Sequence, residues 1–336
     1  MKLSRLGEFG LIDKIRRATP KGRGVRLGIG DDAAWVDIPS SSCLVTADLL
    51  LEGIHFDLKW TSLFDLGYKS LAVNLSDIAA MGGVPAYVVL SLGIPAHFRT
   101  EQIDEFYRGI KNLSRKSAVA LVGGDISIAR SLLISVCLLG HAPHRPVARH
   151  GAKVGDDIYV TGTLGDAALA LNLLKSKSPA LGHPAAAFLL KRHHQPTARC
   201  LAGALLARQK LAAAMIDVSD GLLQDLGHIC HASDVGAEIW EESLPLSRSY
   251  RMLAGKEGSR WALSGGEDYE LLFCARRQKR PEVNALANRA GMPMSRIGAC
   301  VARREGITVI DRNGRKVTLP IQGHDHFRQP LSGRSK

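Results

Sequence analysis

Short apolar segments that carry an acidic residue alternate along this chain with helical stretches. Three segments, "CLVTADLL" (43–50), "AVALVGGD" (118–125) and "AAAMIDVSD" (212–220), each predict a strand whose end bears the acid. Helices are predicted between them at 100–118, 164–177 and 183–209, the last interrupted by a proline. This alternation predicts an α/β (α+β) fold, and proteins of that class bind ligands at strand ends.

Asp77 interrupts a segment that otherwise predicts a buried helix. Leu71, Leu75 and Ile78 recur at helical spacing, and the pair Gly82 and Gly83 marks the helix end. Aspartate is a poor helix former, and a buried carboxylate is costly without a cation or hydrogen-bond donors beside it. The sequence therefore predicts a cation close to this helix.

Length and composition indicate an ordinary globular protein of two domains. The chain has 336 residues, 46% of them hydrophobic and 23% charged, and domains are typically about 150 residues long. The stretch 140–162, rich in Gly, Pro and His, separates two alternating halves. We expect an N-terminal domain at 1–149 and a C-terminal domain at 150–336.

The cysteines and the hydrophobic pattern indicate a cytoplasmic protein. Six cysteines are spaced singly without a C-x-x-C pair, which argues against a disulfide framework and a zinc site. The first residues, "MKLSRLGEFGLIDKIRRA", are charge-interrupted, unlike a signal peptide, and no apolar run reaches about 18 residues. We expect no membrane association.

The net charge of +12 and the pI near 9.6 raise the alternative of a nucleic-acid binder. Apart from "RRQKR" (276–280) and the C-terminal tail, however, the basic residues are dispersed, and aromatic residues make up only 5% of the chain. We expect no nucleic-acid partner, and interpret the charge as a solvated surface that also attracts anionic substrates.

Acidic residues, in contrast, recur in clusters beside glycines. The clusters lie at 28–35, 46–57, 74–77, 121–127, 215–227 and 264–273. Each alone is typical of a turn or a helix cap. Together they predict a Mg²⁺ site, because gathered carboxylates need a cation and oxygen ligands favour hard ions, and Mg²⁺ in turn suggests phosphate. The chain lacks the P-loop and protein-kinase motifs, so we expect metal ions to carry the charge neutralisation.

The motifs "GIGDDAA", "EGIHF", "YKSLAVNLSDIAAMG", "IDVSDGL", "WALSGGEDYEL" and "GHDHF" resemble those of thiamine-monophosphate kinases, in unbroken order over roughly residues 8–327. The wider superfamily includes aminoimidazole ribonucleotide synthetase. The resemblance implies two α/β domains of that type, the first pairing its sheet with a second subunit in a homodimer and the second built on a mixed sheet. It also implies transfer of the γ-phosphoryl group of ATP to thiamine monophosphate, giving thiamine diphosphate, without a general base.

The resemblance also implies site residues. Those expected to bind Mg²⁺ are Asp32, Thr46, Ala47, Asp48, Asp77, Asp125, Asp217 and Asp220. Those expected at ATP are Gly124, Asp125, Arg149, Ser219 and Tyr107. Those expected at thiamine are His55, Glu267 and His324. Tyr107 as a helix core residue and His55 as a structural histidine remain open.

Three positions depart from the family pattern. Ala47 replaces a hydroxyl residue and could coordinate only through its backbone, Ile126 replaces a threonine, and His324 replaces an aromatic residue. Ile126 and His324 keep open a non-catalytic Mg²⁺ or nucleotide sensor. A selenophosphate synthetase is a further alternative, but it normally needs a reactive cysteine in an N-terminal loop, and no cysteine precedes Cys43.

Overall fold

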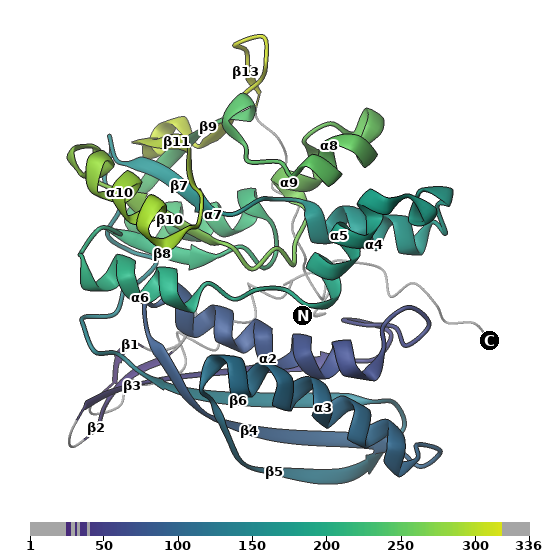
Figure 1. Cartoon of the computed structure of the whole chain (residues 1–336). Helices are drawn as coiled ribbons and strands as arrows, with labels where there is room; N and C mark the ends of the chain where they lie inside the picture. Colours follow the sequence, from purple (N-terminus) through teal and green to yellow (C-terminus); the bar gives the residue numbers. More distant parts are fainter. Residues whose placement is uncertain (1–24, 28–30, 32–33, 39–40, 318–336) are drawn as a thin grey trace, which may run out of the picture.

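The computed structural model describes residues 25–27, 31, 34–38 and 41–317. Two sheets are separated by the connection between His141 and Asp157, and the predicted division at 149/150 falls within it. Figure 1 shows the first sheet with two helices on one side, and the second sheet with the remaining helices beyond them.

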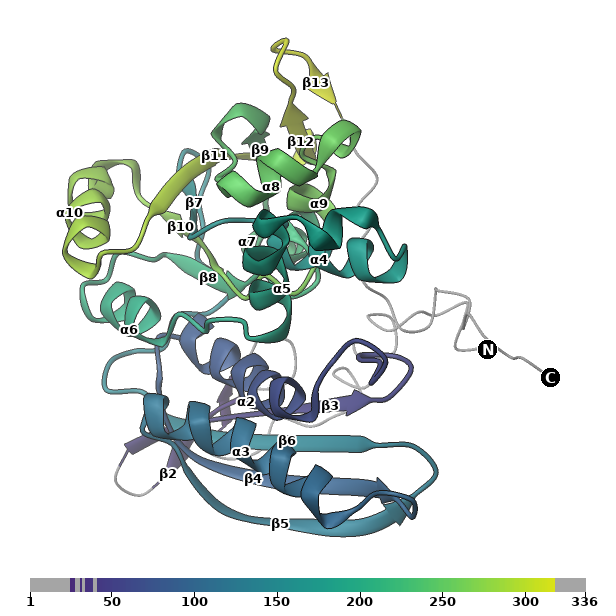
Figure 2. The same ribbon diagram turned by 45° about the vertical axis from the view of Figure 1, so that its right-hand side comes forward.

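The first sheet has the strand order β1-β2-β3-β6-β4-β5. Its strands are β1 (Val25–Leu27), β2 (Ala34–Ile38), β3 (Ser41–Leu51), β4 (Val84–Pro95), β5 (Ala120–Ala129) and β6 (Leu133–His141). Helices α2 (Leu63–Ala80) and α3 (Thr100–Ser117) cover one face (Figure 2). Alternate residues of β6 are buried against these helices, as the two-residue period of a strand requires.

The second sheet has the strand order β13-β12-β9-β11-β7-β10-β8. Its strands are β7 (Asp157–Thr161), β8 (Ala214–Asp217), β9 (Val235–Trp240), β10 (Leu271–Ala275), β11 (Met294–Ala302), β12 (Ile307–Ile310) and β13 (Lys316–Val317). Its helices are α4 (Asp166–Lys175), α5 (Pro184–His194), α6 (Cys200–Arg208), α7 (Leu222–Ser233), α8 (Arg248–Leu253), α9 (Arg260–Ser264) and α10 (Arg280–Ala290). The pairing of β9 with β12 is parallel and the others are antiparallel, so the sheet is mixed.

The predicted helices and strands occur, but two acids lie elsewhere in their strands than expected. Helix 183–209 is divided at the proline into α5 and α6, because proline cannot continue the hydrogen-bond ladder. Asp217 ends β8 as predicted. Asp48 and Asp125, in contrast, lie inside β3 and β5, so the expectation that each strand ends at its acid is wrong for these two.

Helix α2 lies between the two domains. Ala79 and Ala80 of α2 belong to a buried cluster with Ala202 and Leu206 of α6, while Leu71 and other α2 residues pack on the first sheet. Almost every α2 residue is buried, including the polar residues Lys69, Asn74 and Ser76, so this helix contacts other elements nearly all round.

Glycines let α2 approach α3 closely. A Cβ on Gly67 would lie 2.0 Å from the carbonyl oxygen of Phe106, and one on Gly109 would lie 2.0 Å from that of Phe64. Both contacts are impossible for real atoms, so the crossing depends on both glycines.

We expect Gly109→Ala to lower the free energy of unfolding by about 1–3 kcal/mol, because overpacking outweighs the gain in helix propensity. Thermal unfolding measures the change. Gly182→Ala is the matched control, since a Cβ there meets no atom within 4 Å. Equal stability of the two variants would contradict the close crossing.

Candidate active site

Consecutive residues of α2 contact both domains. The Thr46 hydroxyl of β3 donates a short hydrogen bond to the Asp77 carboxylate. The Ser76 hydroxyl donates to Oδ2 of Asp217, at the end of β8, over 2.6 Å. Asp77 of α2 and Asp217 at the end of β8 are thereby tied to neighbouring positions of one helix, at the junction of the domains.

Further acids gather at this junction. Burial, and then the like charge of Asp220, raises the pKa of Asp48 to about 6. Burial, with the charges of Asp220 and Asp217, also raises the pKa of Asp225 well above its usual range. The Tyr269 phenol, whose pKa is raised mainly by burial, lies within the field of the same acids. Asp48, Asp217 and Asp220 therefore lie close together. Asp77 adjoins them through Thr46 and through its neighbour Ser76, so these four expected ligands form one acidic cluster drawn from both domains.

Two acid-rich loops of the second domain hold each other in place. The backbone N–H groups of Glu267 and Tyr269 donate to the carbonyl oxygens of Ser219 (2.7 Å) and Val218 (2.9 Å). Glu267 and Tyr269 have φ of 69° and 52°, which non-glycine residues adopt only where the surroundings impose it. Ser219, a predicted ATP residue, is thus fixed through its backbone.

Asp225 shapes the loop that carries Asp220. Its Oδ2 accepts the backbone N–H of Asp220 over 3.1 Å and that of Gly221 over 3.0 Å. These bonds satisfy donors at the N-terminus of α7, where a carboxylate is stabilised by the helix dipole. Sequence reasoning missed this role, although "DGLLQD" contains the helical spacing that could have indicated it.

Glu267 contacts two cationic or titratable side chains of the chain itself. Lys69 Nζ of α2 lies 2.7 Å from its Oε1, and His193 Nδ1 of α5 lies 3.1 Å from its Oε2. Burial alone would raise the pKa of Glu267, but the charge of Lys69 and the contact with His193 hold it well below its usual range. Neither Lys69 nor His193 was predicted, because nothing in the sequence indicates which residue they face.

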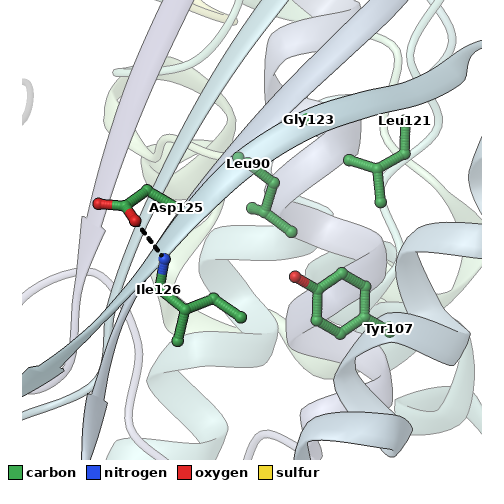
Figure 3. Close-up of a pocket in the computed structure, with 7 residues that line it drawn as sticks. Leu90, Tyr107, Leu121, Gly123, Asp125 and Ile126 are labelled. Atoms are coloured by element: carbon green, nitrogen blue, oxygen red, sulfur yellow. Dashed lines mark hydrogen bonds between the residues drawn. The ribbon is translucent and has the colours of Figure 1, made fainter.

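Asp125 does not join the acidic cluster within one copy of the chain. Pairing across the sheet places Asp48 level with Val136, Leu90 and Gly124, on the face that α2 covers. Asp125 lies one residue further along, and its side chain therefore projects from the opposite face. Figure 3 shows its carboxylate turned away from Tyr107. Asp125, expected to hold a further Mg²⁺ on ATP, therefore lies apart from the acidic cluster in a single chain.

Tyr107, Gly124 and Ile126 line a hollow of about 390 Å³ between α3 and β5, together with Leu90 and Leu121 (Figure 3). A Cβ on Gly124 would lie 1.8 Å from the carbonyl oxygen of Leu90, so only glycine allows this strand contact. Tyr107 is half-buried, with a pKa raised by burial. Gly123 and Asp125 also line this hollow, so it is partly polar. A partly apolar hollow beside a tyrosine ring can accommodate a flat ring of a ligand.

The remaining predicted residues are more dispersed. The Ala47 side chain is exposed on the face opposite Asp48. His55 Nδ1 accepts the Leu51 backbone N–H over 3.0 Å, which gives this histidine a structural role in the turn after β3. The backbone N–H of Arg149 donates to the carboxylate of Asp31. The Nε atom of Arg149 lies 3.8 Å from Oδ1 of the same carboxylate. The predicted residues Asp32 and His324 lie outside the described residues.

The acidic cluster fits a hard divalent cation chemically. All its donors are oxygens, and the pKa of Asp48 is raised by burial and then by the like charge of Asp220, which a cation would neutralise. Among the described residues, no three His, Cys, Asp or Glu side chains are grouped closely enough to hold a metal by themselves. Mg²⁺ commonly takes only one or two carboxylates and completes its shell with water and substrate phosphates.

Comparison with known proteins identifies the class first. Residues 30–142 match the family model "AIR synthase related protein, N-terminal domain", and residues 153–311 match "AIR synthase related protein, C-terminal domain". The chain therefore belongs to the AIR synthase related proteins and has their mixed α/β fold of two domains. Hydrogenase maturation protein HypE from E. coli shares the fold, with a TM-score of 0.71 and 19% identity over 93% of this chain and 97% of that one.

Within that class, the chain belongs to the thiamine-monophosphate kinase family. The thiamine-monophosphate kinase of Escherichia coli (strain K12) is 41% identical over 96% of this chain and 99% of its own length. The thiamine-monophosphate kinase of Bacillus subtilis (strain 168) is 33% identical over 96% of this chain and 100% of its own length. The solved structure "AaThiL complexed with AMPPCP and TMP" has a TM-score of 0.85 and 36% identity, covering 97% of this chain and 99% of that one.

The domain junction carries one testable pH dependence. Burial, and then the neighbouring His193, lower the pKa of His194 to about 4. An unfolded histidine titrates near 6.5, so the unfolded chain takes up a proton first as pH falls, and stability decreases between pH 6.5 and 4. We expect His194→Gln to flatten that decrease by up to about 1.4 kcal/mol per pH unit.

Denaturant unfolding at several pH values measures the slope. His144→Gln is the control, because that side chain is exposed. An unchanged slope in His194→Gln would show that the neutral imidazole is not linked to folding.

Proposed function

We propose that this chain transfers the γ-phosphoryl group of ATP to the phosphate of thiamine monophosphate, giving thiamine diphosphate and ADP, the last step in forming that cofactor. The proposal rests on membership of the thiamine-monophosphate kinase family. The observation that carries it is the acidic cluster of Asp48, Asp77, Asp217 and Asp220 at the domain junction. The phosphates of ATP and of thiamine monophosphate repel each other, so cations are needed to bring them together. Acids from both domains would bind those cations.

The proposed mechanism requires positioning and charge neutralisation. The acceptor is already an anionic phosphate oxygen, so no side chain has to remove a proton. Asp48, Asp77, Asp217 and Asp220 would hold several Mg²⁺ ions, with Thr46 orienting Asp77. Mg²⁺, when bound, neutralises charge on the phosphate oxygens. Arg149 and Ser219 would contact the nucleotide, and Asp32 would join the metal ligands.

We place thiamine near Glu267, because a carboxylate pairs with the cationic ring, with His55 and His324 as further contacts. The base of ATP would lie in the hollow beside Tyr107, with Gly124 presenting its backbone. The proposed location is the cytoplasm, since all six cysteines are unpaired, as a reducing compartment favours. No described helix is long and apolar enough to span a membrane.

We further propose a homodimer formed through β5. This edge strand exposes Val122 (57%), Ile126 (60%) and Ile128 (76%). A long apolar strand at a sheet edge is an association site unless it is covered. Asp125 projects from this strand away from the acidic cluster of its own chain. In the proposed dimer it would instead face the second copy, and it would bind substrate or metal there. Ala47 lies on the same open face and would coordinate through its carbonyl.

The proposed reaction is tested by Asp77→Asn. We expect the wild-type chain to form thiamine diphosphate and an equal amount of ADP only with Mg²⁺, and the variant to lose at least 10²-fold in turnover, because one charge of the metal site is gone. Product separation by chromatography measures both, and thermal unfolding verifies that the variant is folded. Asp57→Asn, a change in a turn outside the cluster, is the control.

Near-normal turnover of Asp77→Asn would remove this residue from the metal site. ATP binding without any product in the wild-type chain would favour a nucleotide sensor. Binding of nucleic acid that is salt-sensitive and survives loss of the acids would favour the nucleic-acid alternative.

The dimer is tested by Ile128→Lys. We expect the wild-type chain to have twice the monomer mass by light scattering, and the variant to have the monomer mass, because a buried charge opposes edge pairing. Leu201→Lys, at a 67% exposed position on α6, is the control and should not change the mass. A dimer that survives Ile128→Lys would place the interface elsewhere.

A further inference from the structure

Lys69, Glu267 and His193 bring three elements together at the domain junction. The Lys69 and His193 side chains are only 8% and 6% exposed, whereas the Glu267 side chain is 25% exposed. Glu267 is thus the member of the trio whose side chain solvent or a ligand can reach. Each of its oxygens contacts one neighbour and retains a further lone-pair direction.

The conformation of Glu267 is fixed from two sides. Its φ of 69° and its N–H bond to Ser219 set the backbone. Lys69 Nζ then pairs with one oxygen of the side chain, and His193 Nδ1 lies next to the other. A buried ion pair is seldom the most stabilising choice, because two apolar residues of similar volume would avoid the desolvation cost. Stability alone therefore does not account for this pair.

We propose that Lys69 and His193 are positioning residues that keep the Glu267 carboxylate ionised and aimed at the cationic ring of thiamine monophosphate. The inference rests on the proposed function, in which Glu267 binds that ring. Lys69 does not touch the substrate; it acts through Glu267. In the pair Lys69–Glu267, the lysine is buried and the glutamate is the more exposed partner. A ligand therefore meets the negative charge, which favours a cationic ring over a neutral ring of the same shape.

The charge state follows from the surrounding groups. Burial would make Glu267 neutral, but Lys69 and His193 keep its pKa well below the usual range. His193 is itself neutral near pH 7, since burial and the charge of Lys69 lower its pKa. The other titratable neighbours are His194, which Asp65 and Lys69 also influence, Lys175 beside His193, and the Tyr269 phenol. None of these can replace the charge of Lys69.

The experiment compares the full-length chain with Lys69→Met, Lys69→Arg, Glu267→Gln and the double variant Lys69→Met/Glu267→Gln. Calorimetry measures binding of thiamine monophosphate without ATP at several pH values between 5.5 and 8.5. Steady-state kinetics gives kcat and the KM for each substrate. Lys111→Met, on the exposed side of α3, is the matched control.

We expect Lys69→Met to weaken binding of thiamine monophosphate about tenfold or more at pH 7.5, with kcat and the KM for ATP within about twofold of wild type. Binding should weaken further as pH falls, because Glu267 then takes up a proton, whereas wild-type binding stays level. Lys69→Arg should restore most of the affinity. The double variant should bind no more weakly than Glu267→Gln, since both act through one carboxylate.

A large loss of kcat, or losses that add in the double variant, would overturn the inference and indicate that Lys69 contacts the phosphate directly. If Lys69→Met does not fold, His193→Gln and Lys69→Arg test the inference in its place. A smaller, pH-dependent loss of affinity for thiamine monophosphate in His193→Gln supports the inference, and unchanged affinity in that variant overturns it. A wild-type chain that binds thiamine monophosphate without phosphorylating it would refute the proposed function alone. A wild-type chain that does not bind it would refute both.

Discussion

The hydrogen bonds from Thr46 to Asp77 and from Ser76 to Asp217 determine how the rest of the site is arranged. They fix α2 between the two domains, so that acids of both sheets face one space. Like charges in a poorly solvated space raise each other's pKa, as Asp48 shows, and disfavour the folded chain at neutral pH. An arrangement that costs stability in the free protein is stabilised by any cation that binds there, because binding to the folded state alone shifts the folding equilibrium.

In a second buried group next to the site, arginines offset the charge of Glu270, whereas burial raises the pKa of Asp268 well above its usual range. Glu270 is fully buried, and it accepts hydrogen bonds from Thr161, Arg192 and Arg199. Asp268, two residues before it, accepts the backbone N–H of Gly165 over 2.6 Å. Satisfied buried charges hold one conformation, because any displacement leaves a charge unpaired. This group anchors the loop that also carries Glu267 and Tyr269.

The sequence predicted the elements better than their orientation. The buried helix with an acid in it and the break between α5 and α6 follow from spacing and from proline, which are local properties. The face on which Asp125 projects depends on strand register, because a shift of one residue moves a side chain to the other face. Lys69 could not be predicted as a partner of Glu267, since the two are almost 200 residues apart and meet only when the domains pack.

The distribution of basic residues bears on the nucleic-acid alternative. In "RRQKR", Arg276 forms an ion pair with Asp156. Arg280 forms another with Asp157, in which Nε lies 2.6 Å from Oδ2. Lys279 lies 2.9 Å from Glu282. Within the described part of the chain, the densest basic run is therefore largely neutralised by its own neighbours, and an array of cations for a phosphate backbone is not formed there.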